Sequence, residues 1–430
     1  MRVLHLLKTA VGARWALCQT RELVKLGVDV HVALPEGPLV DAYRSAGVSV
    51  HLAQLDLPVS RPWAFPRVAG DLRRLVDRVR PDIIHSHFVG TTLTMRLALG
   101  RRHATPRVFQ VPGPLHLEHT PYRQLDLFSA GRQDYWIGSC RWTRDRYGRA
   151  GVEPGRRFLS YYGTDVEHMQ ATGVPGALRA ELSLRPATKV VGMVAYMYAP
   201  KRWLGQWRGV KGHEDLIDAV ALCVSRGLDV VCVMAGGAWN GAIAYERQVR
   251  AYGRRKLGDR AIFLGTRGDV ARIYPDIDVA VHPSLSENVG GAAESLLMGR
   301  PTIATHVGGV PDVISHGETG WLVPPRDPAR LATAIADALA SPEGARRMAA
   351  AGQARARQLL DVRENAREIR QIYEAILSSS AAGPRGDERY WRMRTFCGAA
   401  SPERLAGSSA RANDSSHASM RVRPTVSIGS

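Results

Sequence analysis

The sequence contains no uninterrupted apolar run that approaches the ~18 residues needed to cross a bilayer. Its opening stretch, MRVLHLLKTA, is too short for the apolar core of a secretory signal, and no clear cleavage site follows it, so we interpret it as a first buried strand. The five cysteines are scattered and never spaced as CxxC or CxxH. This spacing argues against a disulfide framework or a zinc site and favours a reducing cell interior.

Two ligand-binding motifs are also missing. The first strand is followed by TAVGARWA rather than by the G-x-G-x-x-G that an NAD-dependent oxidoreductase requires. Asp276 and Asp278 form an Asp-Ile-Asp segment that resembles a metal-binding DxD. The segment stands just before a buried strand, so we interpret it as structural and expect no metal ligands here.

Acidic residues are outnumbered by basic ones. Lysine and arginine total 58 against 40 acidic residues, which gives a net charge of +18, and nearly all the cations are arginines. Such an excess favours polyanions, phosphorylated ligands or an anionic membrane surface as partners. An arginine-rich surface without any such partner is the alternative explanation. The basic residues form no recognised motif, so we do not expect nucleic acid to be a partner.

Two successive alternations of strands and helices predict an α/β protein with two domains. A length of 430 residues suits this number, because domains typically have ~100–200 residues. The first alternation begins at RVLHLL and the second at KVVGMVAYM. We expect one Rossmann-like domain over 1–172, a Gly- and Pro-containing hinge over 173–188, and a second Rossmann-like domain over 189–360.

The end of the chain has a different composition. A last helix is expected over 361–380, and the segment 381–430 is rich in Ser, Ala, Gly and Arg without periodicity. We predict that this tail is disordered. Open parallel sheets bind ligands at the carboxyl ends of their strands, and two such sheets joined by a hinge form a cleft.

The segment SENVGGAAESLLMG carries the most specific chemical signal. After a strand and a loop, Gly290 and Gly291 begin a helix whose free N–H groups and dipole favour an anion. Glu287 and Glu294 flank the glycines and can accept hydrogen bonds from sugar hydroxyls. This pattern is typical of a nucleotide-sugar site. The alternative is that both glutamates merely complement the helix dipole.

Most of the chain resembles the family 4 glycosyltransferases, which are retaining enzymes of the GT-B fold. The donor-binding region carries the clearest resemblance, in HPSLSEN, then GG and ES, then PTIAT and TGWLVPP. The segments MRVLHL, PDIIHSH, YYGTDVEHM, GVKGHEDLIDAV and AIFLGTRGDVARIYPDIDVAVHPS are also similar to the family. The resemblance covers roughly 1–376 and implies two Rossmann-like domains that face each other across a cleft.

The resemblance implies roles for individual residues. Lys211 matches the lysine that contacts the donor diphosphate, Glu294 the glutamate that holds the ribose, and Glu287 the glutamate near the donor sugar. The remaining donor-binding positions implied by the family are Gly12, Thr266, Arg267, Asn288, Val289, Gly290 and Gly291.

The chain departs from the family pattern around its cations and its glutamates. Glu287 and Glu294 are seven positions apart (294 − 287), whereas the family usually has eight. Tyr196 stands near the usual place of an arginine that assists the lysine. We expect the missing cation to come from the longer basic loop that follows, which offers Lys201, Arg202 and Arg208.

A third departure concerns a histidine. The family usually has one near the position of Pro112, and this chain has His116 and His119 just beyond it. We take both as candidate catalytic residues, together with Lys211 and Glu287. The alternative for each histidine is an ordinary surface position.

The expected reaction is the retaining transfer of a hexose-like unit from a nucleotide diphosphate sugar to a saccharide or lipid-linked acceptor, without a metal or other cofactor. The family implies polysaccharide or other glycoconjugate synthesis in the bacterial cell envelope. A cytoplasmic protein, peripheral at the inner face of the plasma membrane, is therefore expected. A nucleotide-sugar epimerase of the same fold and a non-enzymatic polyanion-binding protein are the alternatives.

Overall fold

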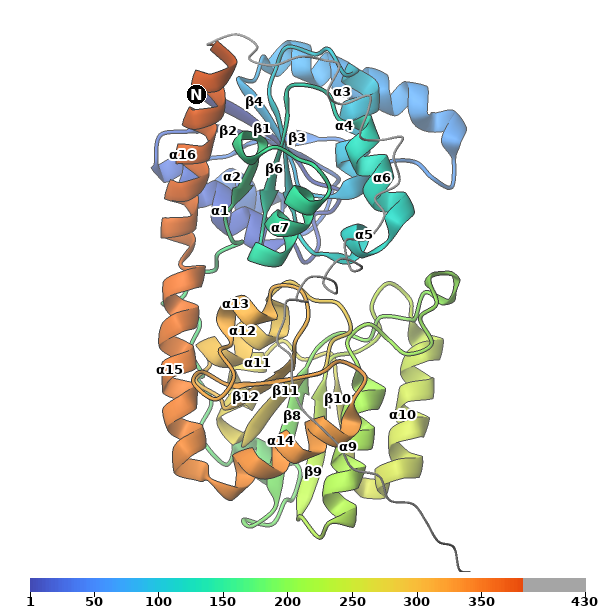
Figure 1. Ribbon diagram of the computed structural model, residues 1–430, viewed down its shortest axis with the longest axis vertical. Coiled ribbons are helices and arrows are strands. Elements are labelled where there is room, and N and C mark those ends of the chain that lie inside the picture. The colour runs from blue at the N-terminus through green and yellow to red at the C-terminus, as the bar shows by residue number, and fades with distance from the viewer. Residues whose placement is uncertain (382–430) are drawn as a thin grey trace, which may run out of the picture. The chain divides into compact units, whose positions relative to one another are not determined.

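The structure, a computed structural model, describes residues 1–381, which belong to one compact unit (Figure 1). The tail predicted over 381–430 lies, apart from its first residue, outside the described residues. Within the described part of the chain, none of the helices is both long enough and apolar enough to span a membrane.

The first half of the chain forms a seven-stranded parallel sheet in the order β3-β2-β1-β4-β5-β6-β7. Its strands are β1 (Arg2–Leu6), β2 (Asp29–Leu34), β3 (Ser49–Leu52), β4 (Ile83–Ser86), β5 (Arg107–Val111), β6 (Asp134–Gly138) and β7 (Arg157–Leu159). The helices are α1 (Arg14–Lys25), α2 (Val40–Ser45), α3 (Phe65–Val79), α4 (Val89–Leu99), α5 (Leu115–Glu118), α6 (Thr120–Ser129) and α7 (Arg141–Arg149). The central strands are buried along nearly their whole length, because helices cover both faces of a parallel sheet.

The second half forms a six-stranded parallel sheet in the order β10-β9-β8-β11-β12-β13. Its strands are β8 (Lys189–Val194), β9 (Val230–Ala235), β10 (Ala261–Gly265), β11 (Val279–His282), β12 (Thr302–Thr305) and β13 (Trp321–Val323). The helices are α8 (Ala177–Glu181), α9 (His213–Ser225), α10 (Ile243–Leu257), α11 (Val270–Ile273), α12 (Gly290–Leu297), α13 (Val310–Val313) and α14 (Pro328–Ala340). The predicted α/β class with two Rossmann-like sheets is confirmed.

The last two helices, α15 (Pro342–Leu360) and α16 (Val362–Ala381), connect the second half with the first. Helix α16 lies beside α1 (Figure 1), and Ile369, Tyr373 and Ile376 pack in the core of the N-terminal sheet. The Arg370 guanidinium also donates to the Leu26 carbonyl oxygen at 2.9 Å. The end of the described chain is therefore part of the N-terminal core, although it follows the second sheet in sequence.

Candidate functional site

The strand order of the second sheet reverses between β8 and β11, so the loops after these strands frame a crevice. Lys211 lies at the end of the loop after β8, and Glu287 lies in the loop after β11. Gly212 has a φ of 75°, and a Cβ there would stand 2.1 Å from the Pro283 carbonyl oxygen. Glycine permits both the positive φ and this close approach, which brings the two loops together.

The Lys211 ammonium forms an ion pair with the Glu287 carboxylate, and these side chains are 20% and 12% exposed. Burial alone would lower the pKa of Lys211, but the Glu287 charge outweighs it and the pKa is raised. Burial would likewise raise the pKa of Glu287, but Lys211 lowers it. Both groups are therefore charged at neutral pH, and an anion that enters the crevice can replace the carboxylate beside Lys211.

The Glu287 side chain also covers the first turn of α12. A Cβ at Gly290 would stand 2.6 Å from Glu287 Oε1, and a Cβ at Gly291 would stand 2.6 Å from His282 Nδ1. Glu287 Oε1 accepts a hydrogen bond of 3.1 Å from the Asn288 backbone N–H. The carboxylate thus occupies the place where the N–H groups of a helix start would hold an anion.

Glu294 lies one turn inside α12 and is partly buried. Burial raises the pKa of its carboxyl group, and the Tyr274 phenol only partly offsets this effect. Tyr274 itself is fully buried. A buried carboxylate with few donors around it is a strong acceptor for ligand hydroxyls, and a raised pKa is typical of functional sites.

The basic loop after β8 places one cation, Lys211, beside the Glu287 carboxylate. Lys201 and Arg202 are exposed, and Arg208 forms ion pairs with two aspartates of α9. Within residues 1–381, Lys211 is the one lysine or arginine whose side chain pairs with Glu287. The structure therefore does not place Lys201, Arg202 or Arg208 beside the Glu287 carboxylate, and the expectation that one of them contacts the donor diphosphate stays a prediction.

The loop after β10 carries the residues expected near a nucleotide base. Arg267 forms ion pairs with Glu181 at 2.8 Å and with Asp269 at 2.7 Å. Thr266 Oγ1 lies 2.7 Å from the point where a Cβ at Gly237 would stand. This glycine lets the loop after β9 approach Thr266, whereas the Arg267 guanidinium is held by two acids.

Two loops of the N-terminal half reach this region. Gly12 has a φ of 72°, and a Cβ there would stand 3.2 Å from the Trp239 ring. The Asn288 side-chain amide donates to Ser139 Oγ at 3.1 Å, and Val289 is buried immediately before α12. Residues of both halves therefore border the segment that begins α12.

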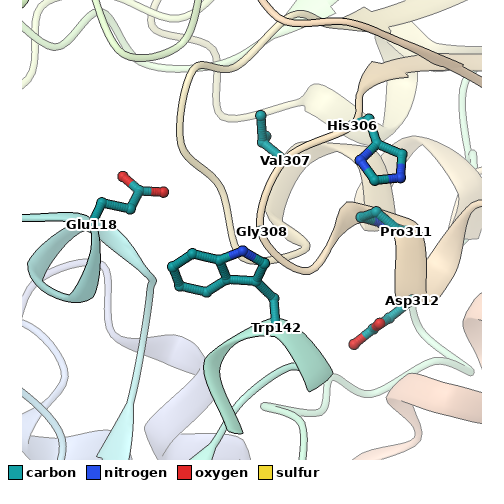
Figure 2. A pocket seen from close by; sticks show the side chains of 7 residues that line it. All are labelled: Glu118, Trp142, His306, Val307, Gly308, Pro311 and Asp312. Carbon is teal, nitrogen blue, oxygen red and sulfur yellow. The ribbon is translucent and has the colours of Figure 1, made fainter. Parts of the chain in front are cut away.

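A pocket lies beside these contacts and is lined from both halves (Figure 2). Its lining residues are Glu118, Trp142, His306, Val307, Gly308, Pro311 and Asp312. Glu118 Oε1 accepts a hydrogen bond of 3.1 Å from the Ser286 hydroxyl. A Cβ at Gly308 would stand 1.8 Å from the Glu287 carbonyl oxygen. The pocket therefore adjoins the segment that carries the Lys211–Glu287 pair.

The two candidate histidines are placed differently. His116 Nε2 lies 3.1 Å from the Tyr147 hydroxyl and 3.5 Å from Asp126 Oδ2. Asp126 also accepts from Tyr147 at 2.6 Å and forms a buried ion pair with Arg96 at 2.6 Å. The His116 Nε2 is thus engaged in the core of the N-terminal half. His119 lies between α5 and α6 and is half-buried.

The Asp-Ile-Asp segment is engaged in backbone contacts. Asp276 accepts hydrogen bonds of 2.6–3.2 Å from three backbone N–H groups at the start of α8. Asp278 accepts from the Val190 N–H at 2.7 Å and from Arg179 at 2.6 Å. The Asp276 carboxylate therefore holds the start of α8 against the sheet, and the Asp278 carboxylate stabilises the start of β8.

Two family models match the chain. The model described as Glycosyltransferase Family 4 matches residues 12–168, and the model described as Glycosyl transferases group 1 matches residues 203–341. The D-inositol 3-phosphate glycosyltransferase of Segniliparus rotundus is 27% identical over 79% of this chain and 76% of its own length. The putative glycosyltransferase EpsD of Bacillus subtilis is 25% identical over 81% of this chain and 95% of its own length.

Some matches are more local. The D-inositol 3-phosphate glycosyltransferase of Mycolicibacterium gilvum is 31% identical, but the match spans 44% of this chain and 40% of that protein. Among solved structures, Anabaena HepE in complex with UDP has a TM-score of 0.72 at 22% identity, over 87% of this chain and all of its own. Sucrose-phosphate synthase of Thermosynechococcus elongatus has a TM-score of 0.72 at 20% identity, over 88% of this chain and all of its own.

The two family matches show that the chain is a glycosyltransferase, and its two parallel sheets and the likeness to these solved structures give it the GT-B fold. The chain belongs to the glycosyltransferases whose N-terminal domain is that of Glycosyltransferase Family 4 and whose C-terminal domain is that of Glycosyl transferases group 1.

Several residues of the site were not predicted from the sequence. Trp142 and Ser139 follow β6, Glu118 ends α5, and Tyr274 lies before β11. Trp142 and Ser139 had a usable signal, because both stand just beyond the carboxyl end of a strand, where open sheets bind ligands. Tyr274 had none, because a buried aromatic residue is ordinary core material.

Proposed function

We propose that this chain transfers a sugar from a nucleoside diphosphate sugar to an acceptor hydroxyl, with retention of configuration at the anomeric carbon. One observation carries the proposal: the Lys211–Glu287 ion pair covers the start of α12, and the partly buried Glu294 lies one turn further along that helix. Cation, free N–H groups and hydroxyl acceptors are the three requirements of a nucleotide-sugar site.

In this proposal the donor diphosphate takes the place of the Glu287 carboxylate beside Lys211 and Gly290. The bond between the anomeric carbon and the phosphate oxygen breaks, and the ammonium and the helix dipole stabilise the charge of the leaving diphosphate. The acceptor hydroxyl forms the new bond on the same face and gives its proton to the leaving phosphate. The protein supplies the positive charge, so the proposed reaction requires neither a metal nor a cofactor.

The two glutamates take separate roles. Glu294, whose pKa is raised by burial, accepts hydrogen bonds from the ribose hydroxyls of the nucleotide. Glu287 loses its partner when the diphosphate binds Lys211, and its oxygens then accept from hydroxyls of the donor sugar. An exchange of partners of this kind couples donor binding to the position of the loop after β11.

The pocket beside Glu287 suits the acceptor. Trp142 offers an indole face, and Glu118 and Asp312 offer carboxylates, a mixture of apolar and polar groups that suits a sugar ring (Figure 2). The relatives include the lipopolysaccharide core biosynthesis mannosyltransferase LpsB of Rhizobium meliloti, which is 26% identical over 50% of this chain. We therefore propose a saccharide or lipid-linked acceptor in the synthesis of a bacterial cell-envelope polysaccharide or other glycoconjugate.

An anionic membrane surface is a proposed partner at the cytoplasmic side. Leu125 and Phe128 on α6 are 47% and 53% exposed, and Tyr122 on the same helix lies 6.0 Å, centroid to centroid, from the exposed Trp203 ring. Apolar side chains in a chain of net charge +18 suit an anionic bilayer. Sedimentation with anionic and with zwitterionic vesicles tests this, with Phe128→Ser as the variant and exposed Ile243→Ser as the matched control. Equal binding to both vesicle types would contradict an anionic membrane surface as a partner.

The donor proposal is tested by thermal stabilisation with UDP, GDP, ADP and NAD. A ligand that binds the folded state raises its stability, and UDP is the first choice because the HepE structures contain UDP and UDP-glucose. We expect one nucleoside diphosphate to raise Tm, and Lys211→Ala and Glu294→Ala to abolish the rise. Stabilisation by NAD alone would contradict the proposal.

The nucleotide sugar that matches the stabilising nucleotide is then incubated with and without an oligosaccharide acceptor. NMR of the anomeric proton reports whether the new linkage keeps the donor configuration, and an inverted linkage would reject retention. Conversion of the donor sugar without any acceptor would indicate the epimerase alternative instead.

A further inference from the structure

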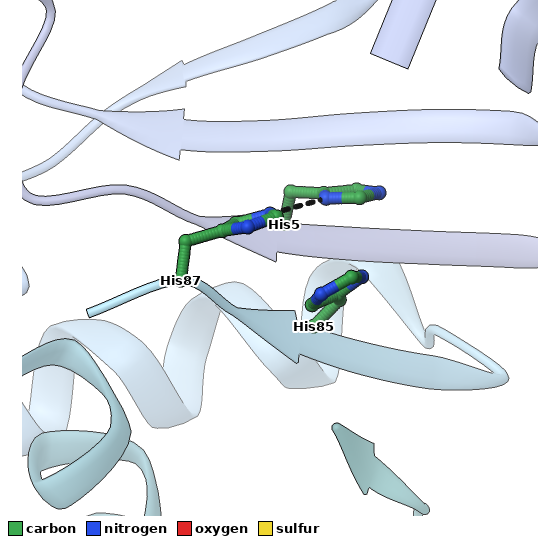
Figure 3. A group of neighbouring side chains, drawn as sticks. All are labelled: His5, His85 and His87. Carbon is green, nitrogen blue, oxygen red and sulfur yellow. Dashed lines mark hydrogen bonds between the residues drawn. The ribbon is translucent and has the colours of Figure 1, made fainter. Parts of the chain in front are cut away.

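Three histidines lie together inside the N-terminal half, away from the residues discussed above. His5 stands on β1, His85 on β4 directly opposite it in the parallel register, and His87 just after β4 (Figure 3). All three are fully buried. One ring nitrogen of each can be chosen such that all three atoms lie within 4.8 Å of one another.

Hydrogen-bond accounting identifies a free lone pair on His5. The Tyr162 hydroxyl donates its one proton to the Gln110 carbonyl oxygen at 3.0 Å, so at 2.9 Å it must accept from His87 Nδ1. His87 Nε2 is then an acceptor, and it accepts from His5 Nδ1 at 2.9 Å. His5 Nε2 is left as a buried acceptor that has no partner among the described residues.

His85 adds a second unpaired nitrogen. Its Nδ1 lies 2.5 Å from the Tyr373 hydroxyl of α16, and its Nε2 is buried without a partner among residues 1–381. An unpaired buried polar atom costs free energy, so a cluster of three histidines that contains two of them requires an explanation. The phenols of Tyr373 and Tyr162 fix the orientation of two rings from their far nitrogens, as the outer partners of metal-binding histidines do.

The electrostatic setting suits a cation ligand set. Burial lowers the pKa of His5 to about 3 and lowers the pKa values of His85 and His87 well below the usual value. The imidazoles are therefore neutral at physiological pH, which is the form that binds metals.

We propose that His5, His85 and His87 bind a first-row divalent transition-metal ion of the zinc, cobalt, nickel and copper group, for which neutral imidazole is a suitable ligand. His87 ligates through Nε2 and His5 through Nδ1, two nitrogens that lie 2.9 Å apart, and one ring nitrogen of His85 completes the set. When the metal binds, the His5 proton moves from Nδ1 to Nε2, so the ring remains neutral. Because Zn–N bonds measure about 2.0–2.1 Å, the three nitrogens must move closer than the 4.8 Å limit of the unliganded cluster.

The proposed ion has a structural role. It connects β1 with β4. Through the contact between His85 and Tyr373 it also fixes the His85 ring against α16. The cluster offers nitrogen ligands and no carboxylate within the described group, so the charge of the ion is not neutralised.

The test uses the full chain, unfolded and refolded with a chelator, and then refolded with Co²⁺ or Zn²⁺, because the buried site loads during folding. We expect one Co²⁺ per chain with the visible absorption of a nitrogen-ligated ion, and a higher Tm after refolding with Zn²⁺. His5→Gln and His85→Gln should weaken Co²⁺ binding at least tenfold.

His31→Gln is the matched control, because His31 Nδ1 and His51 Nε2 form a similar pair at 2.9 Å outside the cluster. The control should keep the spectrum. Absence of a stoichiometric metal in the wild type, or loss of binding in His31→Gln alone, would overturn the proposal. Should the His5 and His85 variants fail to refold, the wild-type stoichiometry and its metal-dependent Tm decide the question.

Discussion

The two halves of the chain use charged side chains in opposite ways. In the first half, Arg96 lies between Asp126 and Asp134 at 2.6 and 3.0 Å, and all three side chains are at most 1% exposed. In the second half, the Lys211–Glu287 pair lies in a crevice and both side chains retain some exposure. The first network balances its charges inside the protein, whereas the second can exchange one partner for a ligand.

This difference teaches how to separate a structural ionic group from a functional one. A buried network loses stability when one member is removed, because the remaining charge cannot reach water. A pair at a crevice contributes less to stability but can stabilise charge that develops on a ligand. The comparison predicts that substitutions in the first half affect folding, and those in the second half affect turnover.

The largest effect is expected for Asp126→Ala. The substitution leaves Arg96 without one of its two carboxylates and Tyr147 without its acceptor, so we expect a loss of about 3–5 kcal/mol in unfolding free energy. Urea denaturation followed by circular dichroism measures it. In Asp145→Ala, the control, an exposed pair with Arg144 is removed, and the loss should stay below about 1 kcal/mol. Equal losses in the two variants would erase the proposed contrast.

Lys211→Ala should have the opposite effect to Asp126→Ala, with a large loss of turnover and little loss of stability. Without the ammonium the leaving diphosphate lacks its main cation, so we expect kcat to fall about 10²–10³-fold, as when one electrostatic donor is removed from an enzyme site. The unfolding free energy should change little, because Glu287 can still reach water. Steady-state rates with the donor that the thermal-stabilisation experiment identifies provide the measurement, and Lys256→Ala, a surface lysine paired with Asp218, is the control. A fall in stability with unchanged kcat would assign Lys211 a structural role.

Much of the fold and part of the candidate site could be predicted from the sequence. Strand and helix alternation predicted both sheets, because parallel strands are continuous apolar runs and their helices are amphipathic. Lys211, Glu287 and the helix start at Gly290 were predicted, and the structure brings them together. Glu287 and Gly290 are local neighbours in the sequence, whereas Lys211 is 76 positions from Glu287 and reaches it because β8 and β11 are adjacent in the sheet.

The partners of individual side chains were harder to predict. Arg208 was one of three candidates for the missing donor cation, and in the structure it forms ion pairs with Asp215 and Asp218 in the first two turns of α9. His116 was expected to replace the missing histidine, and its Nε2 contacts Tyr147 and Asp126 instead. In both cases the partner is chosen by tertiary packing, which leaves no periodic signal in the sequence. Whether these residues bind the donor or catalyse the reaction stays a prediction.

Trp142→Ala tests whether a residue of the first half contributes to turnover, because Trp142 lines the pocket beside Glu287. If the pocket binds the acceptor, loss of the indole face should raise the acceptor KM about tenfold, which corresponds to ~1.4 kcal/mol, without changing nucleotide affinity. Initial rates at varied acceptor concentration measure the first quantity, and nucleotide-dependent Tm measures the second. Trp207→Ala, at a tryptophan that is 79% exposed, serves as the control. A change in nucleotide affinity alone would place Trp142 on the donor side.

The smallest effect tests whether Glu294 is kept at a cost in stability. Burial raises the pKa of Glu294 in the folded protein, so the folded state binds more protons than the unfolded state. Its contribution to stability is therefore full below the unfolded pKa of ~4.3 and declines as pH rises through the folded value. Glutamine carries no such titration, so Glu294→Gln should be more stable than wild type at pH 8 and not at pH 4.

The expected gain is about 0.5–2 kcal/mol, the range common for substitutions that relieve a strained functional site, and nucleotide-dependent stabilisation should weaken in the same variant. Urea midpoints across this pH range measure the gain, and the exposed Glu318→Gln is the control that should leave the pH profile unchanged. A Glu294→Gln variant that is less stable at every pH would show that the carboxylate stabilises α12, and Glu294 would then resemble the internal network of the first half rather than a ligand-binding group.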